Sequence, residues 1–108
     1  MLTTPLETLK KYIDQPSGSY DVEDVAKVAD MFAEDFASLG FDVKKHQGPN
    51  FGPSLECTIG TGEKCLLLMG HMDTVFPRGV YVPYHDNGDG TAKGSGIMDM
   101  KGGIVVML

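Results

Sequence analysis

The sequence predicts a mixed α/β fold, on three observations. Apolar residues recur at helical spacing over roughly the first forty positions, alternate with polar residues from position 41 onward, and form an unbroken run at the end. Helices before and after such strands are typical of an α/β sheet. A length of 108 residues leaves room for one domain of ordinary size.

Two helices are expected first, and the shorter one opens the chain. Thr4-Pro5-Leu6-Glu7 has the form of a capping box with proline at the first helical position. Pro16 cannot continue a helix and ends this one. The apolar stripe of this helix is Leu6, Leu9 and Ile13.

The second expected helix is the longest element. Asp21 stands where an N-cap belongs, after the turn Ser17-Gly18-Ser19, and Gly40 stands where a terminating glycine belongs. The residues between them that recur at steps of three and four are Val22, Val25, Ala29, Phe32, Phe36 and Leu39. This spacing predicts an amphipathic helix with one buried face.

Strands of a mixed sheet are expected next. Residues 41–44 and 55–59 alternate between apolar and polar, which predicts half-buried strands. The glycine-rich residues 60–63 predict a hairpin turn, and the continuously apolar residues 65–69 predict a central strand covered on both faces. Residues 86–90, Asp-Asn-Gly-Asp-Gly, predict the tip of a further hairpin.

The chain ends on five apolar residues, 104–108, which predict the first turns of a helix that continues. We therefore expect this sequence to be a piece of a longer protein. Docking of the same residues on the sheet is the alternative.

Composition and charge narrow the class of partner. The chain carries 9 basic and 15 acidic residues, a net charge of −6, which disfavours nucleic acid and anionic membrane surfaces. The N-terminus has no secretory signal pattern, and no apolar run is long enough to span a membrane. The two cysteines, Cys57 and Cys65, are too few for a disulfide framework. We expect free, buried thiols rather than a disulfide bond across a hairpin, and therefore a cytoplasmic protein.

A histidine and an aspartate follow the expected central strand, in Gly70-His71-Met72-Asp73-Thr74-Val75. Ligands bind at the carboxyl ends of strands in open α/β sheets. In extended backbone His71 and Asp73 point the same way. A carboxylate on the second ring nitrogen of a histidine is typical of metal sites, and a hydrogen-bonded structural histidine is the alternative.

A second acid stands among glycines, in the segment 94–103, Gly-Ser-Gly-Ile-Met-Asp-Met-Lys-Gly-Gly. Asp99 would open a helix, where the helix dipole favours a carboxylate, but a cap does not require the flanking glycines. Asp99 also replaces the third glycine of a nucleotide-binding loop and would repel phosphate. A calcium loop over residues 86–90 is excluded because glycine stands where oxygen donors are needed.

Together, the two segments resemble the paired signatures of the M20 zinc-dependent exopeptidases and amidohydrolases, a family that includes glutamate carboxypeptidase, acetylornithine deacetylase and succinyl-diaminopimelate desuccinylase. The spacing of the two segments and Phe76-Pro77 fit the glutamate carboxypeptidase branch. The resemblance implies that residues 1–108 are the N-terminal portion of a zinc-exopeptidase-like α/β/α catalytic domain, with no second domain present.

The resemblance also implies roles for single residues. His71 would be a zinc ligand, Asp99 the carboxylate that bridges two zinc ions, and Asp73 the catalytic acid that orients His71. Residues 100–103 would shape the turn behind Asp99, whose following peptide bond is often cis in the family. The implied reaction is hydrolysis, by metal-activated water, of an amide bond next to a carboxylate in a small N-acyl amino acid or peptide.

The resemblance leaves the site incomplete. The family's further ligands and its general base would follow residue 108, and His46 and His85 lie in no matching motif and are expected on loops or edges. We therefore expect the isolated chain to be inactive and to bind zinc weakly. Cobalt or manganese could replace zinc, and the full-length protein could form a homodimer. The alternative is a non-catalytic remnant or interaction module that keeps the fold.

Overall fold

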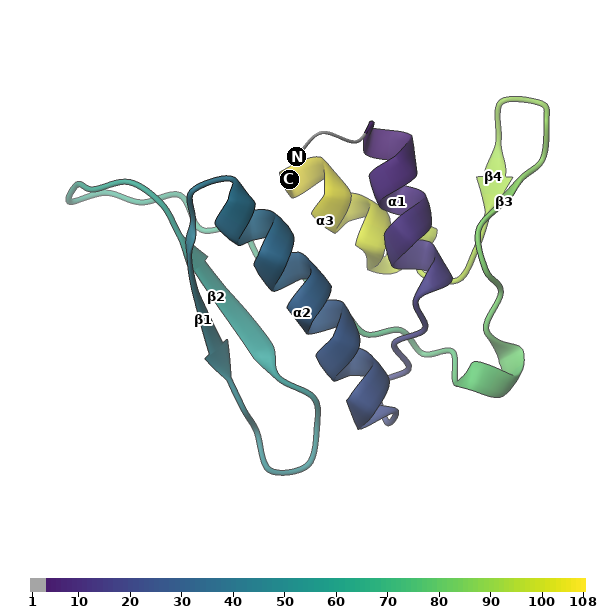
Figure 1. Cartoon of the computed structure of the whole chain (residues 1–108), viewed down its shortest axis with the longest axis horizontal. Helices are drawn as coiled ribbons and strands as arrows, with labels where there is room; N and C mark the ends of the chain where they lie inside the picture. The colour runs from purple at the N-terminus through teal and green to yellow at the C-terminus, as the bar shows by residue number, and fades with distance from the viewer. Residues whose placement is uncertain (1–3) are drawn as a thin grey trace.

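The computed structural model describes residues 4–108, which form three α-helices and two short β-hairpins together with one very short helix and one kinked turn (Figure 1). In chain order the elements are α1 (Pro5–Asp14), α2 (Val22–Ser38), β1 (Asp42–His46), β2 (Ser54–Thr58), the short helix η1 (Arg78–Val80), β3 (His85–Asp86), β4 (Ala92–Lys93), the kinked turn η2 (Ile97–Lys101) and α3 (Gly102–Met107). The expected α/β class is confirmed: two helices come first, strands follow, and a helix ends the chain.

Helix α1 begins with the expected capping box. The Glu7 N–H donates to Thr4 Oγ1 at 3.2 Å, and the Thr4 N–H donates to Glu7 Oε2 at 3.0 Å. The predicted apolar stripe is confirmed at Ile13 and is wrong at Leu6, which is 66% exposed, because the buried members of the helix are Thr8, Tyr12 and Ile13. The face of α1 that packs on the other helices therefore centres on Tyr12.

Helix α2 ends as expected, with Gly40 in the left-handed region at φ +94°. Asp21 occupies the N-cap position, but its side chain makes no capping hydrogen bond. The helix lies between the β1–β2 hairpin on one side and α1 with α3 on the other (Figure 1). Its buried residues are Asp24, Val25, Val28, Ala29 and Phe32.

The core joins all three helices. The rings of Tyr12 and Phe32 stack with centroids 3.8 Å apart, and Val28 and Ile104 complete the buried cluster. Because Ile104 comes from α3, the helix predicted for the last residues is confirmed and closes the core from the third side.

The strands form two separate antiparallel hairpins within residues 4–108, in place of one mixed sheet. In the first, Val43 lies opposite Cys57, and in the second His85 lies opposite Lys93. The tip predicted for residues 86–90 is confirmed. Figure 1 shows the two hairpins on opposite sides of the helices.

The central strand predicted for residues 65–69 is wrong. These residues form no strand and are exposed, Leu66 by 85%. The hairpin turn predicted for residues 60–63 therefore joins no paired strands. The physical reason is that β2 pairs only with β1 among the described strands, so nothing lies alongside residues 65–69 to cover them.

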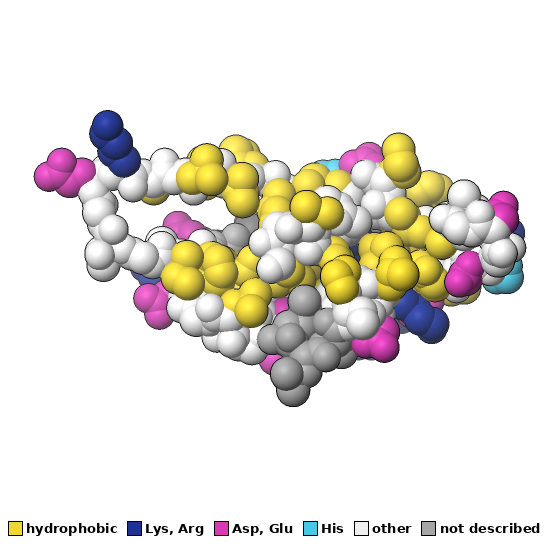
Figure 2. All heavy atoms as spheres, turned by 90° about the horizontal axis from the view of Figure 1, so that it is seen from above, with side chains coloured by type: hydrophobic (Ala, Val, Ile, Leu, Met, Phe, Trp, Pro, Cys, Tyr) yellow, Lys and Arg dark blue, Asp and Glu magenta, His cyan; other side chains and the backbone are white. Residues whose placement is uncertain are grey.

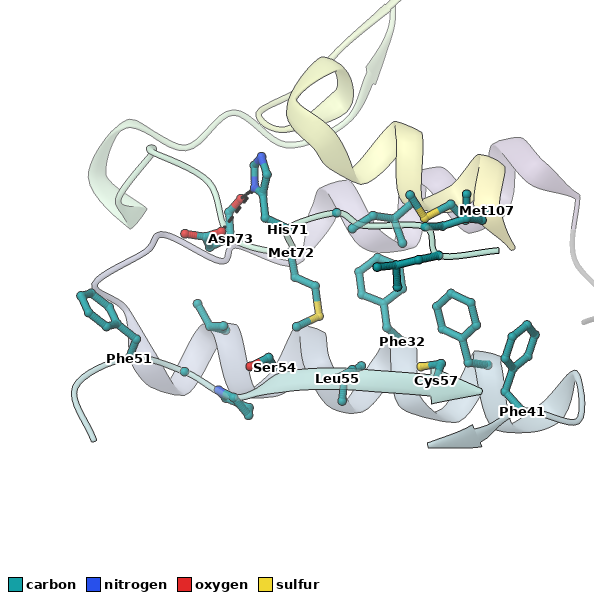
Figure 3. Close-up of a pocket in the computed structure, with 18 of the residues that line it drawn as sticks. Phe32, Phe41, Phe51, Ser54, Leu55, Cys57, His71, Met72, Asp73 and Met107 are labelled. Atoms are coloured by element: carbon teal, nitrogen blue, oxygen red, sulfur yellow. Dashed lines mark hydrogen bonds and ion pairs between the residues drawn. The ribbon is translucent and has the colours of Figure 1, made fainter. Parts of the chain in front are cut away.

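An apolar groove of about 610 Å³ separates this exposed run from β2 (Figure 3). Phe32, Leu55 and Cys57 line it from the side of α2 and β2, and Leu66–Leu68 line it from the other side. Hydrophobic side chains also cover much of the face seen in Figure 2.

Both cysteines are free, as predicted. The expectation that both are buried is wrong for Cys65, which is exposed, while Cys57 is partly buried. Among the helices of residues 4–108, none is long and apolar enough to cross a membrane.

A buried carboxylate ties the loop after residue 76 to α2. Asp24 accepts two hydrogen bonds of 2.7 Å from the Nε and Nη2 atoms of Arg78. These bonds hold the pKa of Asp24 below its ordinary value, against the opposing effect of burial. The arrangement therefore stabilises the folded chain only while Asp24 is ionised.

We expect Asp24→Asn to lower the free energy of unfolding by about 1 kcal/mol at neutral pH, since Arg78 is largely exposed. A depressed folded pKa contributes stability above the unfolded value of about 3.9, and that stability is lost as the pH falls through the folded pKa. The difference between the two proteins, measured by urea unfolding from pH 7 to pH 2, should therefore shrink at acid pH. A difference that stays constant over this range would contradict the prediction.

Candidate metal centre

The two residues expected to bind metal meet in space. His71 Nε2 lies 2.8 Å from Asp99 Oδ1, although 28 positions separate the residues. Both side chains line a hollow of about 660 Å³ between residues 71–76 and residues 92–99. The hollow is open to solvent, since the side chains of His71 and Asp99 are 48% and 82% exposed.

The second ring nitrogen of His71 faces Asp73, as the sequence predicted. His71 Nδ1 lies 3.0 Å from the Asp73 carbonyl oxygen and 3.3 Å from Asp73 Oδ1 (Figure 3). The Ser19 hydroxyl donates to the other carboxylate oxygen, Oδ2, at 2.5 Å. Ser19 therefore holds the carboxylate that faces the imidazole.

The loop between α1 and α2 fixes the backbone around His71. The Thr74 N–H donates to the Ser17 carbonyl at 2.8 Å, and the Ser19 N–H donates to the Thr74 carbonyl at 2.9 Å. The Ser17 hydroxyl donates to the Met72 carbonyl at 2.8 Å. The sequence of residues 17–19 predicts a turn and does not reveal this role, because Ser-Gly-Ser is typical of turns and carries no signal of its distant partner.

The backbone around Asp99 is irregular. Asp99 has φ −133° and ψ 91°, and α3 begins only at Gly102, so the prediction that Asp99 opens the helix is wrong. The turn is closed by a hydrogen bond from the Lys101 N–H to the Gly96 carbonyl at 2.8 Å, with Gly96 at φ +90°. The peptide bond between Asp99 and Met100 is cis, as the family resemblance implied.

The surroundings of His71 favour its protonated form. Burial lowers the pKa of His71, but the hydrogen bonds and negative charges of Asp99 and Asp73 outweigh it and raise the pKa above its ordinary value. Each ring nitrogen faces an oxygen that accepts hydrogen bonds. The same two carboxylates would attract a cation in place of the proton.

The donor set fits zinc in kind and in spacing. Zinc takes imidazole nitrogen and carboxylate oxygen at about 2.0–2.2 Å, so two ligands of one tetrahedral ion lie about 3.3 Å apart. The Nε2–Oδ1 distance of 2.8 Å needs only a small widening to admit the ion. The Asp73 carboxylate lies next to the other ring nitrogen of His71, Nδ1. Metal-binding histidines usually have such a hydrogen-bond partner on the nitrogen that does not bind the metal.

The set is nevertheless short of a complete site. Within residues 4–108, no group of three or more histidine, cysteine, aspartate or glutamate side chains is placed to hold a metal ion. His46 ends β1 and His85 begins β3; both are exposed, as expected for edge residues, and neither lines the hollow beside Asp99. The structure thus brings together His71, Asp73 and Asp99 and leaves the other two histidines apart.

One known protein is similar to this chain over the segments that form the metal centre. No family model matches the chain. Carboxypeptidase G2 of Pseudomonas sp. (strain RS-16) is 38% identical in an alignment that covers 95% of this chain and 26% of that relative. The chain thus spans about a quarter of the length of the relative that it matches. The chain is thus similar, over nearly its whole length, to a part of carboxypeptidase G2, and this similarity supports the resemblance expected from the two motifs.

Proposed function

We propose that residues 1–108 form the first part of the catalytic domain of a carboxypeptidase-like metallohydrolase. The observation that carries the proposal is the 2.8 Å approach of His71 Nε2 to Asp99 Oδ1 at the mouth of a hollow. The 38% identity to carboxypeptidase G2 supports the class of reaction, cleavage of an amide bond next to a carboxylate. The substrate would be a small peptide or N-acyl amino acid.

Each residue has a distinct task in this proposal. His71 would hold zinc through Nε2 and Asp99 would hold it through Oδ1, and the second carboxylate oxygen of Asp99 would be available to a second ion. Asp73 holds the His71 ring through Nδ1 and is itself held by Ser19. A bound zinc ion would supply a Lewis acid that polarises a substrate carbonyl and lowers the pKa of a water molecule. The hollow of about 660 Å³ beside these residues has room for a small substrate.

The proposal assigns turnover to a longer protein rather than to these 108 residues. Zinc sites that catalyse reactions have three protein ligands and an open position, whereas within residues 4–108 His71 and Asp99 converge without a third ligand. The chain therefore supplies two ligands and one orienting acid, and the rest of the site must come from other segments.

Zinc titration of the purified chain tests the proposal. With about half of the usual ligands, we expect a dissociation constant on the order of 10⁻⁵ M for the unaltered chain. Removal of the imidazole in His71→Ala should weaken binding to the order of 10⁻³ M, because one carboxylate remains. The measurement is isothermal titration calorimetry with zinc chloride in a buffer that does not bind zinc.

The matched control is His85→Ala, which removes another exposed imidazole, from the β3–β4 hairpin. We expect the zinc affinity of this variant to equal that of the unaltered chain. Equal affinities of the unaltered chain and His71→Ala would show that zinc binds elsewhere and would refute the proposed site.

A further inference from the structure

A buried ammonium group lies two positions after Asp99. The Lys101 side chain is fully buried, and its Nζ donates to the Tyr12 carbonyl at 2.9 Å and to the Gln15 carbonyl at 2.6 Å. The Tyr81 hydroxyl lies 3.4 Å from the same nitrogen. Burial of a cation is costly unless all its protons are used in hydrogen bonds. Here three oxygen atoms accept hydrogen bonds from the ammonium group.

The oxygen atoms that receive Lys101 belong to the end of α1. A helix leaves its last carbonyl groups without partners in the helix, and its C-terminus favours a positive charge. Tyr12 lies in the last turn of α1 and Gln15 is its C-cap. The Tyr81 hydroxyl caps the same end by donating to the carbonyl of Ile13. Lys101 thus ties η2 to the C-terminal end of α1.

Asp99 depends on this attachment more than His71 does. Its side chain is 82% exposed, and its partner among the described hydrogen bonds is the His71 ring. Its position therefore follows from its backbone, which runs between Gly96 and Gly102. The Lys101 N–H closes that turn on Gly96, and the Lys101 side chain ties the turn to α1.

The end of α1 and the loop after it carry both halves of the centre. Ser17 and Ser19 hold residues 72–74 next to His71, and Tyr12 and Gln15 hold Lys101 next to Asp99. One short stretch of chain, residues 12–19, is thus the common support of the two ligands. Lys101 is the side chain that links the turn carrying Asp99 to this support.

We infer that Lys101 is a positioning residue, which holds Asp99 at ligand distance from His71 by binding the C-terminal carbonyl groups of α1. The inference rests on the proposed function, since it assigns a task within the proposed metal centre. Lys101 itself contacts neither the ion nor the substrate, and its effect passes through the carboxylate of Asp99.

The test is a double-mutant cycle on zinc affinity. Lys101→Met keeps the aliphatic stem and removes the ammonium, and we expect zinc to bind about 10- to 100-fold more weakly. Asp99→Asn removes the carboxylate on which Lys101 acts. In the Asp99→Asn background, Lys101→Met should therefore change the affinity less than about twofold. An equal loss in both backgrounds would mean that Lys101 does not act through Asp99 and would overturn the inference.

Asp35→Asn is the control for a general loss of stability. Asp35 also binds α1, through Lys11 Nζ at 2.7 Å and the Tyr12 hydroxyl at 2.5 Å, and it has no hydrogen bond to η2. We expect this variant to unfold at a lower urea concentration and to keep its zinc affinity. Weaker zinc binding in the folded Asp35→Asn protein, by as much as in Lys101→Met, would overturn the inference.

A measurement without metal separates the inference from the proposed function. In the metal-free chain, nuclear Overhauser contacts between the His71 ring and the Asp99 β-protons should be present, lost in Lys101→Met and kept in Asp35→Asn. Absence of zinc binding by the unaltered chain would refute the proposed function. The His71–Asp99 contacts in the metal-free chain would still test whether Lys101 positions Asp99. If Lys101→Met does not fold, Lys101→Arg, which keeps a cation, should retain the contacts; their loss in folded Lys101→Arg would refute the inference.

Discussion

Replacement of Phe32 by alanine is expected to lower the free energy of unfolding by about 3–5 kcal/mol. Phe32 is 1% exposed, and its ring stacks on that of Tyr12 with an angle of 6° between the planes. This stack joins α2 to α1, and Ile104 of α3 lies in the same cluster. The variant thus loses both the transfer free energy of a phenyl ring and the contacts around the cavity that it leaves.

Urea unfolding followed by far-ultraviolet circular dichroism measures this loss. Small domains have a stability of about 5–15 kcal/mol, so the variant should lie at or near the limit of folding. Phe51→Ala is the matched control, because the same side chain is 55% exposed there. We expect this control to cost less than about 1 kcal/mol. Similar losses in the two variants would contradict the placement of the core.

Replacement of Gly102 by alanine is expected to have the second largest effect, about 3 kcal/mol of stability together with the loss of zinc binding. A β-carbon at Gly102 would lie 2.3 Å from the Ile97 carbonyl oxygen, which is backbone and cannot rotate away. The Ile97 carbonyl accepts the Gly102 N–H, so relief of the clash must open the turn that carries Asp99. The metal centre should therefore be lost with the turn.

The neighbouring Gly103→Ala isolates this clash from helix propensity. Both glycines lie in α3, where alanine is favoured over glycine by about 1 kcal/mol. A β-carbon at Gly103 would meet only the flexible end of Met100, at 3.4 Å. We expect Gly103→Ala to be neutral or slightly stabilising and to bind zinc normally, by the same unfolding and titration measurements. Equal stability of the two alanine variants would refute the close approach at Gly102.

The helices could be predicted from the sequence because their signals are local. The capping box at Thr4 and the left-handed glycine at Gly40 use hydrogen bonds and backbone angles within a few positions. The tip of the β3–β4 hairpin at residues 86–90 is local in the same way. Such signals need no knowledge of the path of the chain.

Burial was predicted less well, because it depends on neighbours. Residues 65–69 have the composition of a central strand, and they lie exposed because no described strand runs beside them. Leu6 has the spacing of a core residue, and α1 turns a different face, that of Tyr12, toward the core. An apolar pattern predicts which residues favour burial. The packing of the elements decides which of these residues are buried.

The sequence by itself determined which residues are candidates for the metal centre, since His71, Asp73 and Asp99 stand in two recognisable motifs. Only the tertiary structure decided that the His71 imidazole and the Asp99 carboxylate meet, that Ser19 binds Asp73 beside the imidazole, and that Lys101 binds the end of α1. The physical reason is sequence separation: the contacts of Ser19 and Lys101 join residues 54 and 89 positions apart. No local propensity encodes such contacts, which form only once the helices have packed.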